Sequence, residues 1–117
     1  MSDVTGEELA RRLGENGLVV LDVRSAAEFS GEAGYPCDPR QGHIPGARNV
    51  DLQELLAAGD VAVIRALVGA PEGSEVIAYC HSGSRSAMAS EVLRRAGYDA
   101  RNYVGSWHDW AADPDRP

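Results

Sequence analysis

The most constraining feature of the chain is an apolar segment that leads directly into a cysteine and then into a helix. Residues 76–79 are mostly apolar and strand-forming, and Cys80 follows them. Five small or polar residues, 81–85, separate this cysteine from a helix-forming segment over residues 86–96. A strand joined to a helix by so short a loop is typical of α/β domains, in which parallel strands alternate with helices. The segment therefore predicts that Cys80 lies at the carboxyl end of a strand in a parallel sheet.

The rest of the chain shows the same alternation of strand and helix patterns. Residues 18–21 form a continuous apolar run, as expected of a strand buried on both faces. The expected strands are residues 18–21, 47–50, 75–79 and 101–104. The expected helices are residues 6–13, 25–29, 60–68, 86–96 and 106–112, the fourth with Met88, Val92 and Leu93 as its buried stripe. We therefore expect a single α/β domain over residues 1–117, with its core over about residues 5–112 and an about five-stranded, mostly parallel sheet with helices on both faces.

Net charge and hydropathy exclude several classes of partner. The chain has a formal net charge of −7, whereas binding to nucleic acid or to an anionic membrane requires a positive surface. No apolar run approaches the roughly 18 residues of a membrane span. Residues 1–13 are acidic and polar and lack the pattern of a secretory signal. We therefore expect neither nucleic acid nor a membrane as a partner, and a cytoplasmic location.

Cys80 is the candidate catalytic residue. A buried cysteine after a strand is most often only a small apolar residue, but the polar residues after Cys80 suit a loop around a polar ligand. Backbone N–H groups of such a loop, and the N-terminus of the following helix, both favour an anion. The thiol is therefore expected to ionise more readily than an ordinary cysteine. The candidate substrate-binding residues are His81, Ser82, Gly83, Ser84 and Arg85.

Other kinds of site have weaker support. The two cysteines and three histidines are scattered without paired ligand spacing, so we expect no metal site and no cofactor. The histidines are expected to be structural, because a thiolate stabilised by backbone dipoles needs no general base. The serines lack the elbow motif of serine hydrolases. Cys37 lies in a loop rich in glycine and proline and is expected to be a bystander, with a role as the resolving partner of Cys80 as the alternative.

Several short motifs resemble, in order, those of rhodanese sulfurtransferases. They are Leu21-Asp22-Val23-Arg24, Glu28-Phe29, Gly42-His43-Ile44-Pro45-Gly46-Ala47, Asn49, and Tyr79-Cys80 through Ser86. Residues 102–107, together with Trp110, resemble the closing motif in the catalytic half of tandem thiosulfate/mercaptopyruvate sulfurtransferases. The resemblance covers about residues 18–110 and implies a single rhodanese-like domain similar to that half.

The resemblance implies sulfur transfer through a persulfide on Cys80. In that family a thiolate takes a sulfane sulfur from a donor such as thiosulfate or 3-mercaptopyruvate and passes it to cyanide or a thiol. Backbone N–H groups of the loop, here residues 81–85, hold the persulfide anion. Asp22, Arg24 and His43 match motif positions that brace the loops around the site. The implied partners are a small-molecule sulfur donor, a thiol or cyanide acceptor, and a possible sulfur-acceptor protein.

Two alternatives to an active sulfurtransferase remain open. A sulfur carrier or docking module would form the same persulfide and discharge it only to a partner protein. Phosphatases and arsenate reductases of related fold have five residues between cysteine and arginine, whereas four separate Cys80 from Arg85. The loop around the cysteine is therefore tighter here, which favours a single sulfur atom over a tetrahedral oxyanion. The donor is also open, because Glu28 stands where thiosulfate-specific relatives often have arginine, and a carboxylate facing the pocket would repel a dianion.

Overall fold

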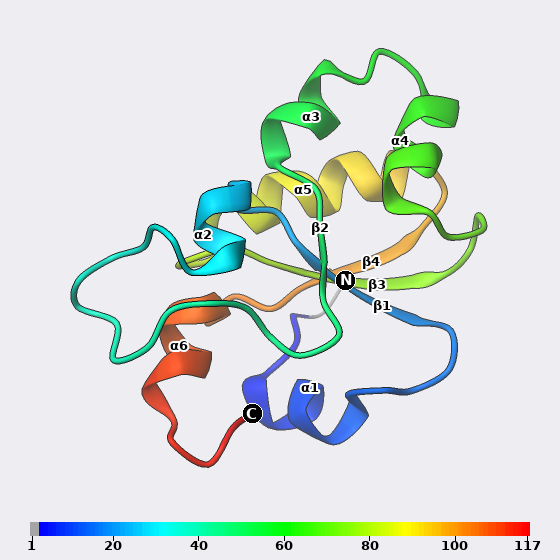
Figure 1. Cartoon of the computed structure of the whole chain (residues 1–117). Coiled ribbons are helices and arrows are strands. Elements are labelled where there is room, and N and C mark those ends of the chain that lie inside the picture. The colour runs from blue at the N-terminus through cyan, green and yellow to red at the C-terminus, as the bar shows by residue number, and fades with distance from the viewer. Residues whose placement is uncertain (1–2) are drawn as a thin grey trace.

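Two apolar runs form the centre of the sheet in the computed structural model, which describes residues 3–117. β1 (Leu18–Asp22) and β3 (Glu75–Tyr79) lie side by side and pair in parallel along their whole length. β2 (Arg48–Asn49) pairs with β1, and β4 (Asp99–Asn102) pairs with β3, again in parallel. The strand order is β2-β1-β3-β4, and the strands end at the same end of the sheet, where α2 and α6 lie (Figure 1).

The expected parallel α/β class is confirmed, and the sheet has four strands in the described part of the chain, where about five were expected. Val4 makes an isolated parallel bridge with Tyr103, and a single bridge is too short to count as a further strand. The strand expected over residues 101–104 begins and ends two residues earlier, because β4 follows the register of β3.

Helices cover both faces of the sheet, as expected. Among residues 3–117 they are α1 (Gly6–Arg12), α2 (Ala26–Ser30), α3 (Leu52–Ala57), α4 (Val61–Val68), α5 (Ser84–Arg95) and α6 (Ser106–Ala112). α3, α4 and α5 pack on one face, against Val19 and Leu21 of β1, while α1 and α6 pack on the other, against Val20 (Figure 1). Successive side chains of a strand point to opposite faces, so one apolar run fills two separate cores.

α5 differs from the expected helix in its start and in its buried face. It begins at Ser84, two residues earlier than expected, with Gly83 as its N-cap at φ 100°. Its buried residues are Ser86, Ala89, Ser90 and Leu93. Met88, which was expected in the buried stripe, is 52% exposed. The helix packs on the sheet through small side chains at helical spacing, and their low hydropathy hides this stripe in the sequence.

α3 was not expected from the sequence. A capping box begins it, in which Asp51 accepts from the backbone of the first turn and Glu54 bonds back to the N–H of Asp51. The helix has only six residues, of which Leu52 and Leu55 are buried, so it lacks the repeated period that identifies longer helices. No helix in residues 3–117 combines the length and the apolar character that crossing a membrane requires.

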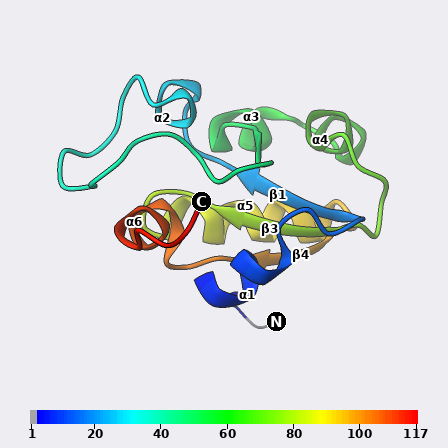
Figure 2. The ribbon, with the colours of Figure 1, turned by 60° about the horizontal axis from the view of Figure 1, so that its bottom comes forward.

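The long loop, residues 31–47, joins α2 to β2 at the end of the sheet where the strands end (Figure 2). It is fastened to α6 and the segment after it. The Arg40 guanidinium donates to the carbonyl oxygens of Trp110 and Arg116 at 3.1 and 2.8 Å. In return the Trp107 indole N–H donates to the carbonyl of Arg40 at 3.2 Å. These hydrogen bonds hold the long loop in place beside the carboxyl end of β3.

Candidate active site

Cys80 lies directly after β3, at the carboxyl end of a central strand, as the sequence predicts. The loop that carries it is tied to the first turn of α6. The Trp107 N–H donates to the carbonyl of Cys80 at 2.9 Å, and the His108 N–H donates to the carbonyl of His81 at 3.0 Å. The N–H of Cys80 itself donates to the Ser106 hydroxyl at 3.0 Å. The backbone on both sides of the sulfur is thus fixed by a second element.

Hydrogen-bond donors surround the Cys80 sulfur on the side of the loop. The Gly83 N–H donates to Sγ at 3.1 Å and the Ser86 N–H at 3.4 Å, and the Ser86 hydroxyl also lies 3.4 Å from Sγ. Ser86 is the third residue of α5, so its N–H has no partner within the helix and is free to bind the sulfur. On the side of the sheet, Cys80 joins the apolar core, and the residue is only 1% exposed.

These donors decide the ionisation of the thiol. Burial by itself raises the pKa of Cys80, because it penalises the charged form. The Ser86 hydroxyl and the N–H groups of Ser86, Gly83 and Ser82 act in the opposite direction and outweigh burial, so the pKa of Cys80 lies below the ordinary value for cysteine. The positive end of the α5 dipole adds to the same effect. The site therefore stabilises the thiolate of Cys80 more than the surroundings of an ordinary cysteine do.

Removing one donor tests this account. The Ser86→Ala substitution is expected to raise the pKa of Cys80 by roughly one unit, because a hydrogen bond to a charged group contributes about 1.5 kcal/mol. The thiolate absorbance can be followed against pH in a Cys37→Ser background, where Cys80 is the only thiol. Ser84→Ala is the matched control, since Ser84 is exposed at the start of α5. An equal shift in both variants would contradict a specific role for Ser86.

Gly83 is the position at which the loop requires glycine. Its φ of 100° is a conformation that other residues rarely adopt, and a Cβ there would lie 2.6 Å from the carbonyl oxygen of Val104. The Asn102 amide donates to the carbonyl of Gly83 at 3.2 Å and closes the loop from the side of β4. This geometry turns the Gly83 N–H toward the sulfur.

Arg85 and Glu28 form the rim of the site. The two N–H groups of the Arg85 fork donate to the Glu28 carboxylate at 2.9 and 3.1 Å, and both residues line a pocket of about 290 Å³ with Gly34 and Tyr35. The capping box of Ser25 and Glu28 at the start of α2 holds the carboxylate in place. The hydrogen bonds from Arg85 lower the pKa of Glu28 to about 2, so the carboxylate is charged at neutral pH. Glu28 therefore faces the site and neutralises its arginine.

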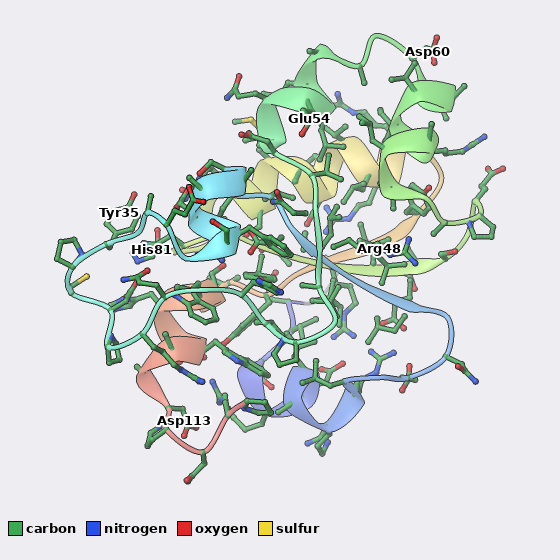
Figure 3. The ribbon with its side chains drawn as sticks, viewed as in Figure 1. Tyr35, Arg48, Glu54, Asp60, His81 and Asp113 are labelled. Carbon is green, nitrogen blue, oxygen red and sulfur yellow. The ribbon has the colours of Figure 1, made fainter. Side chains whose placement is uncertain are left out.

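Substrate binding by the five loop residues stays a prediction, and the side chains of the remaining three have different surroundings. The His81 ring contacts the long loop, where it stacks on Tyr35 with ring centroids 3.7 Å apart and bonds to Asp38 (Figure 3). Ser82 contributes its backbone N–H, while Ser84 is exposed. Ser86, Asn102 and Ser106 were not expected at the site. The free N–H groups of the first turn of a helix were the one sequence signal for Ser86.

A buried ion pair braces the neighbouring strand. Arg24 is 1% exposed and bonds to the Asp22 carboxylate at 2.7 Å and to the carbonyl of Gly42 at 2.6 Å, between the rings of Tyr79 and Trp107. The end of β1 is thereby tied to the long loop, which is the bracing role expected from the motif.

His43 also belongs to the bracing that the motifs imply. Its Nδ1 lies 2.8 Å from the carbonyl oxygen of Phe29, and its ring stacks on the Phe29 ring at 3.7 Å. The contact ties the long loop to the last turn of α2. Both contacts of His43 are thus structural.

Comparison with known proteins gives the relatives of the chain. A "Probable 3-mercaptopyruvate sulfurtransferase" of Pseudomonas aeruginosa is 36% identical to this chain, with 93% of this chain and 41% of that protein covered. A thiosulfate sulfurtransferase of the same organism is 32% identical, with 97% of this chain and 44% of that protein covered. A crystal structure of a "Probable Thiosulfate Sulfurtransferase" matches with a TM-score of 0.82 and 44% identity, over 98% of this chain and 47% of that one.

The chain therefore spans less than half the length of these relatives, and relatives named for two different sulfur donors match it about equally well. The family model for the rhodanese-like domain matches residues 5–113, which is nearly the whole of the chain. The parallel α/β fold and the cysteine loop after β3 agree with that match. The chain belongs to the rhodanese-like domain family.

Proposed function

We propose that this domain is a sulfurtransferase that carries a sulfane sulfur on Cys80. The observation that carries the proposal is the ring of donors from Gly83 and Ser86 around the Cys80 sulfur, which lowers the pKa of the thiol. A thiolate is the nucleophilic form of cysteine, and fixed backbone dipoles stabilise an anion at this point without reorganising. The names of the relatives support sulfur transfer as the class of reaction.

The reaction has two steps. The Cys80 thiolate attacks the outer sulfur of thiosulfate, the S–S bond of the donor breaks, and sulfite leaves with its electron pair. With 3-mercaptopyruvate the C–S bond breaks instead, and pyruvate leaves after its enolate takes up a proton. Cyanide or a thiolate then attacks the outer sulfur of the Cys80 persulfide, and the Cys80 thiolate leaves. The same N–H groups stabilise the anion in the thiolate and persulfide forms.

Mass spectrometry tests the persulfide. Treatment with thiosulfate or 3-mercaptopyruvate is expected to add one sulfur, about 32 Da, to the peptide that contains Cys80, and cyanide is expected to remove it. The peptide that contains Cys37 serves as the internal control, because it carries the other cysteine of the chain. Sulfur found only on the Cys37 peptide would refute the assignment.

The Glu28–Arg85 pair bears on the choice of donor. Glu28→Gln is expected to lower the KM for thiosulfate about three- to tenfold, because it removes a repelling charge and frees the Arg85 guanidinium for the dianion. Glutamine preserves the capping box with Ser25, so α2 remains in place. The KM for the singly charged 3-mercaptopyruvate is expected to change less.

Steady-state kinetics with both donors measure this effect. Glu32→Gln is the matched control, because it makes the same change in net charge at an exposed position. An equal fall in KM in both variants would show a general field effect and would contradict a direct role of Glu28.

The same pair favours a second function, that of a sulfur carrier. Since Glu28 already neutralises Arg85, this arginine offers little attraction to a small anionic donor or acceptor. A protein partner could bring its own groups to displace Glu28. Thiocyanate release with free cyanide, compared with discharge of the persulfide by cell extract, separates the two: discharge by extract alone indicates a carrier. Hydrolysis of an aryl phosphate that depends on Cys80 would instead indicate a phosphatase.

A further inference from the structure

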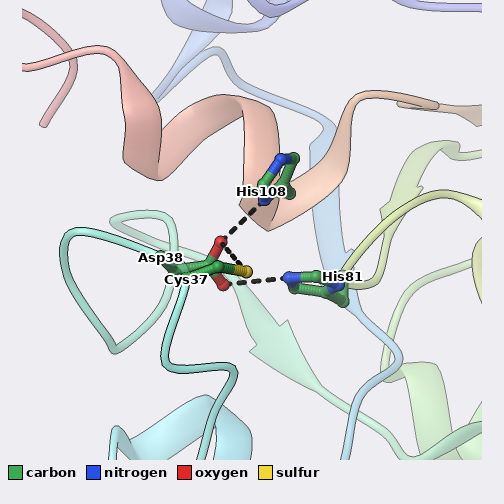
Figure 4. A group of neighbouring side chains, drawn as sticks. All are labelled: Cys37, Asp38, His81 and His108. Atoms are coloured by element: carbon green, nitrogen blue, oxygen red, sulfur yellow. Dashed lines mark hydrogen bonds and ion pairs between the residues drawn. The ribbon is translucent and has the colours of Figure 1, made fainter.

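Four potential metal ligands from distant parts of the sequence meet beside the cysteine loop. Ligand atoms of Cys37, Asp38, His81 and His108 all lie within 4.8 Å of one another (Figure 4). Cys37 and Asp38 belong to the long loop, His81 follows Cys80, and His108 lies in α6. The sequence predicts no metal site, because these residues lack paired spacing along the chain. The fold nevertheless brings their ligand atoms together.

The two imidazole rings point at the same carboxylate. His81 Nε2 lies 2.9 Å from Asp38 Oδ2, and His108 Nδ1 lies 2.8 Å from Asp38 Oδ1. The Cys37 sulfur lies 4.0 Å from Asp38 Oδ1, on the same side. Tetrahedral zinc has bonds of about 2.0–2.3 Å, which places its ligand atoms about 3.3–3.7 Å apart. Movements on the order of 1 Å at the ends of the side chains would therefore enclose an ion.

Neighbouring groups hold these ligands in place. Pro36 and Pro39 flank the Cys-Asp pair and restrict the backbone of the loop there. The ring of Tyr35 stacks on His81 at 3.7 Å, and the His108 N–H donates to the carbonyl of His81 at 3.0 Å. Ligands that are oriented before binding need little reorganisation to receive a metal.

The charges of the cluster also suit a cation. The Asp38 side chain is 0% exposed, and within residues 3–117 its ion pairs are with His81 and His108. A divalent ion would balance the buried carboxylate of Asp38 and a thiolate at Cys37 together, and the chain as a whole carries a net charge of −7. A thiolate, two imidazoles and a carboxylate form a donor set for zinc, whereas magnesium and calcium prefer oxygen ligands alone.

We propose that Cys37, Asp38, His81 and His108 bind one divalent ion of the zinc class in tetrahedral geometry. On binding, the Cys37 thiol and the imidazole nitrogens that face Asp38 release to solvent any protons that they carry, and the ion takes the place of the hydrogen bonds to the carboxylate. The ion fastens the long loop to the cysteine loop and to α6, because each of the three supplies a ligand. The site excludes the Cys80 sulfur, so it stands independently of the proposed sulfur transfer.

Cobalt titration tests the site, because tetrahedral Co²⁺ absorbs strongly in the visible and a thiolate ligand adds a charge-transfer band in the near-ultraviolet. The metal-free, untagged chain is titrated with Co²⁺ under reducing, oxygen-free conditions. We expect saturation at one equivalent with both signals, and displacement of both by one equivalent of Zn²⁺. A spectrum of octahedral cobalt without the thiolate band would overturn the proposal.

The two cysteines of the chain provide matched controls. Cys80→Ser is expected to retain the thiolate band, and Cys37→Ser is expected to lose it. His108→Ala is expected to weaken Co²⁺ binding at least about tenfold, as loss of a ligand requires. The opposite assignment of the band, or unchanged affinity in His108→Ala, would overturn the site.

A second measurement on the parent chain guards against variants that fold poorly. X-ray absorption of the zinc-loaded parent is expected to show one sulfur and three nitrogen or oxygen neighbours. A first shell of oxygen alone, or with two sulfurs, would equally overturn the proposal.

Discussion

The Cys80→Ser variant is expected to lose sulfur transfer at least about a thousandfold, because removing a nucleophile typically removes most of the catalysis. A serine hydroxyl at this position receives the same donors from Gly83 and Ser86, but these donors stabilise an anion that the hydroxyl does not form at neutral pH. Thiocyanate release from thiosulfate and cyanide measures the loss.

The fold of this variant should survive. Serine is close to cysteine in size, and the backbone bonds of Cys80 to Ser106 and Trp107 do not involve the sulfur. A thermal unfolding midpoint within a few degrees of the parent is the control for folding. Turnover close to that of the parent in a folded Cys80→Ser protein would sink the proposed function.

The Arg24→Met variant is expected to lose about 3–5 kcal/mol of unfolding free energy, because it leaves a buried carboxylate without its partner. Asp22 and Arg24 are 0% and 1% exposed, so water cannot replace the lost hydrogen bonds. The loss exceeds that of a surface ion pair, which is typically below about 1 kcal/mol. Urea unfolding measures it.

A double variant identifies the cause. In Asp22→Asn with Arg24→Met, the charge that Arg24 neutralised is gone, and an amide oxygen can still accept the backbone N–H of residue 24. The double variant is therefore expected to be more stable than Arg24→Met alone. If it is not, the loss arises from packing between the rings of Tyr79 and Trp107, and the explanation by a stranded charge is wrong.

Local sequence patterns were enough to predict the elements that position the sulfur. The strand expected over residues 75–79 is confirmed as β3. Cys80 follows it directly, as the pattern predicts. Backbone N–H groups of the loop were expected to favour an anion, and the structure places the Gly83 N–H 3.1 Å from Sγ. These features depend on neighbours within a few positions, which is why the sequence reveals them.

The features that were missed depend on contacts between distant segments. Glu28 and Arg85 are 57 positions apart, and only the packing of α2 against the loop shows that the carboxylate faces the site. The Ser106 hydroxyl accepts from the N–H of Cys80, which lies 26 positions earlier in the chain. The metal-ligand cluster likewise spans residues 37–108, so spacing along the chain carries no sign of it.

The bonds from Ser106 and Trp107 to the backbone of Cys80 have a consequence for biogenesis. Synthesis proceeds from the N-terminus, so Cys80 is made before Ser106 and Trp107, the residues that fix its loop. Until α6 docks, the backbone of the cysteine loop lacks these two hydrogen bonds. The loop that carries the nucleophile is therefore completed only when α6 docks.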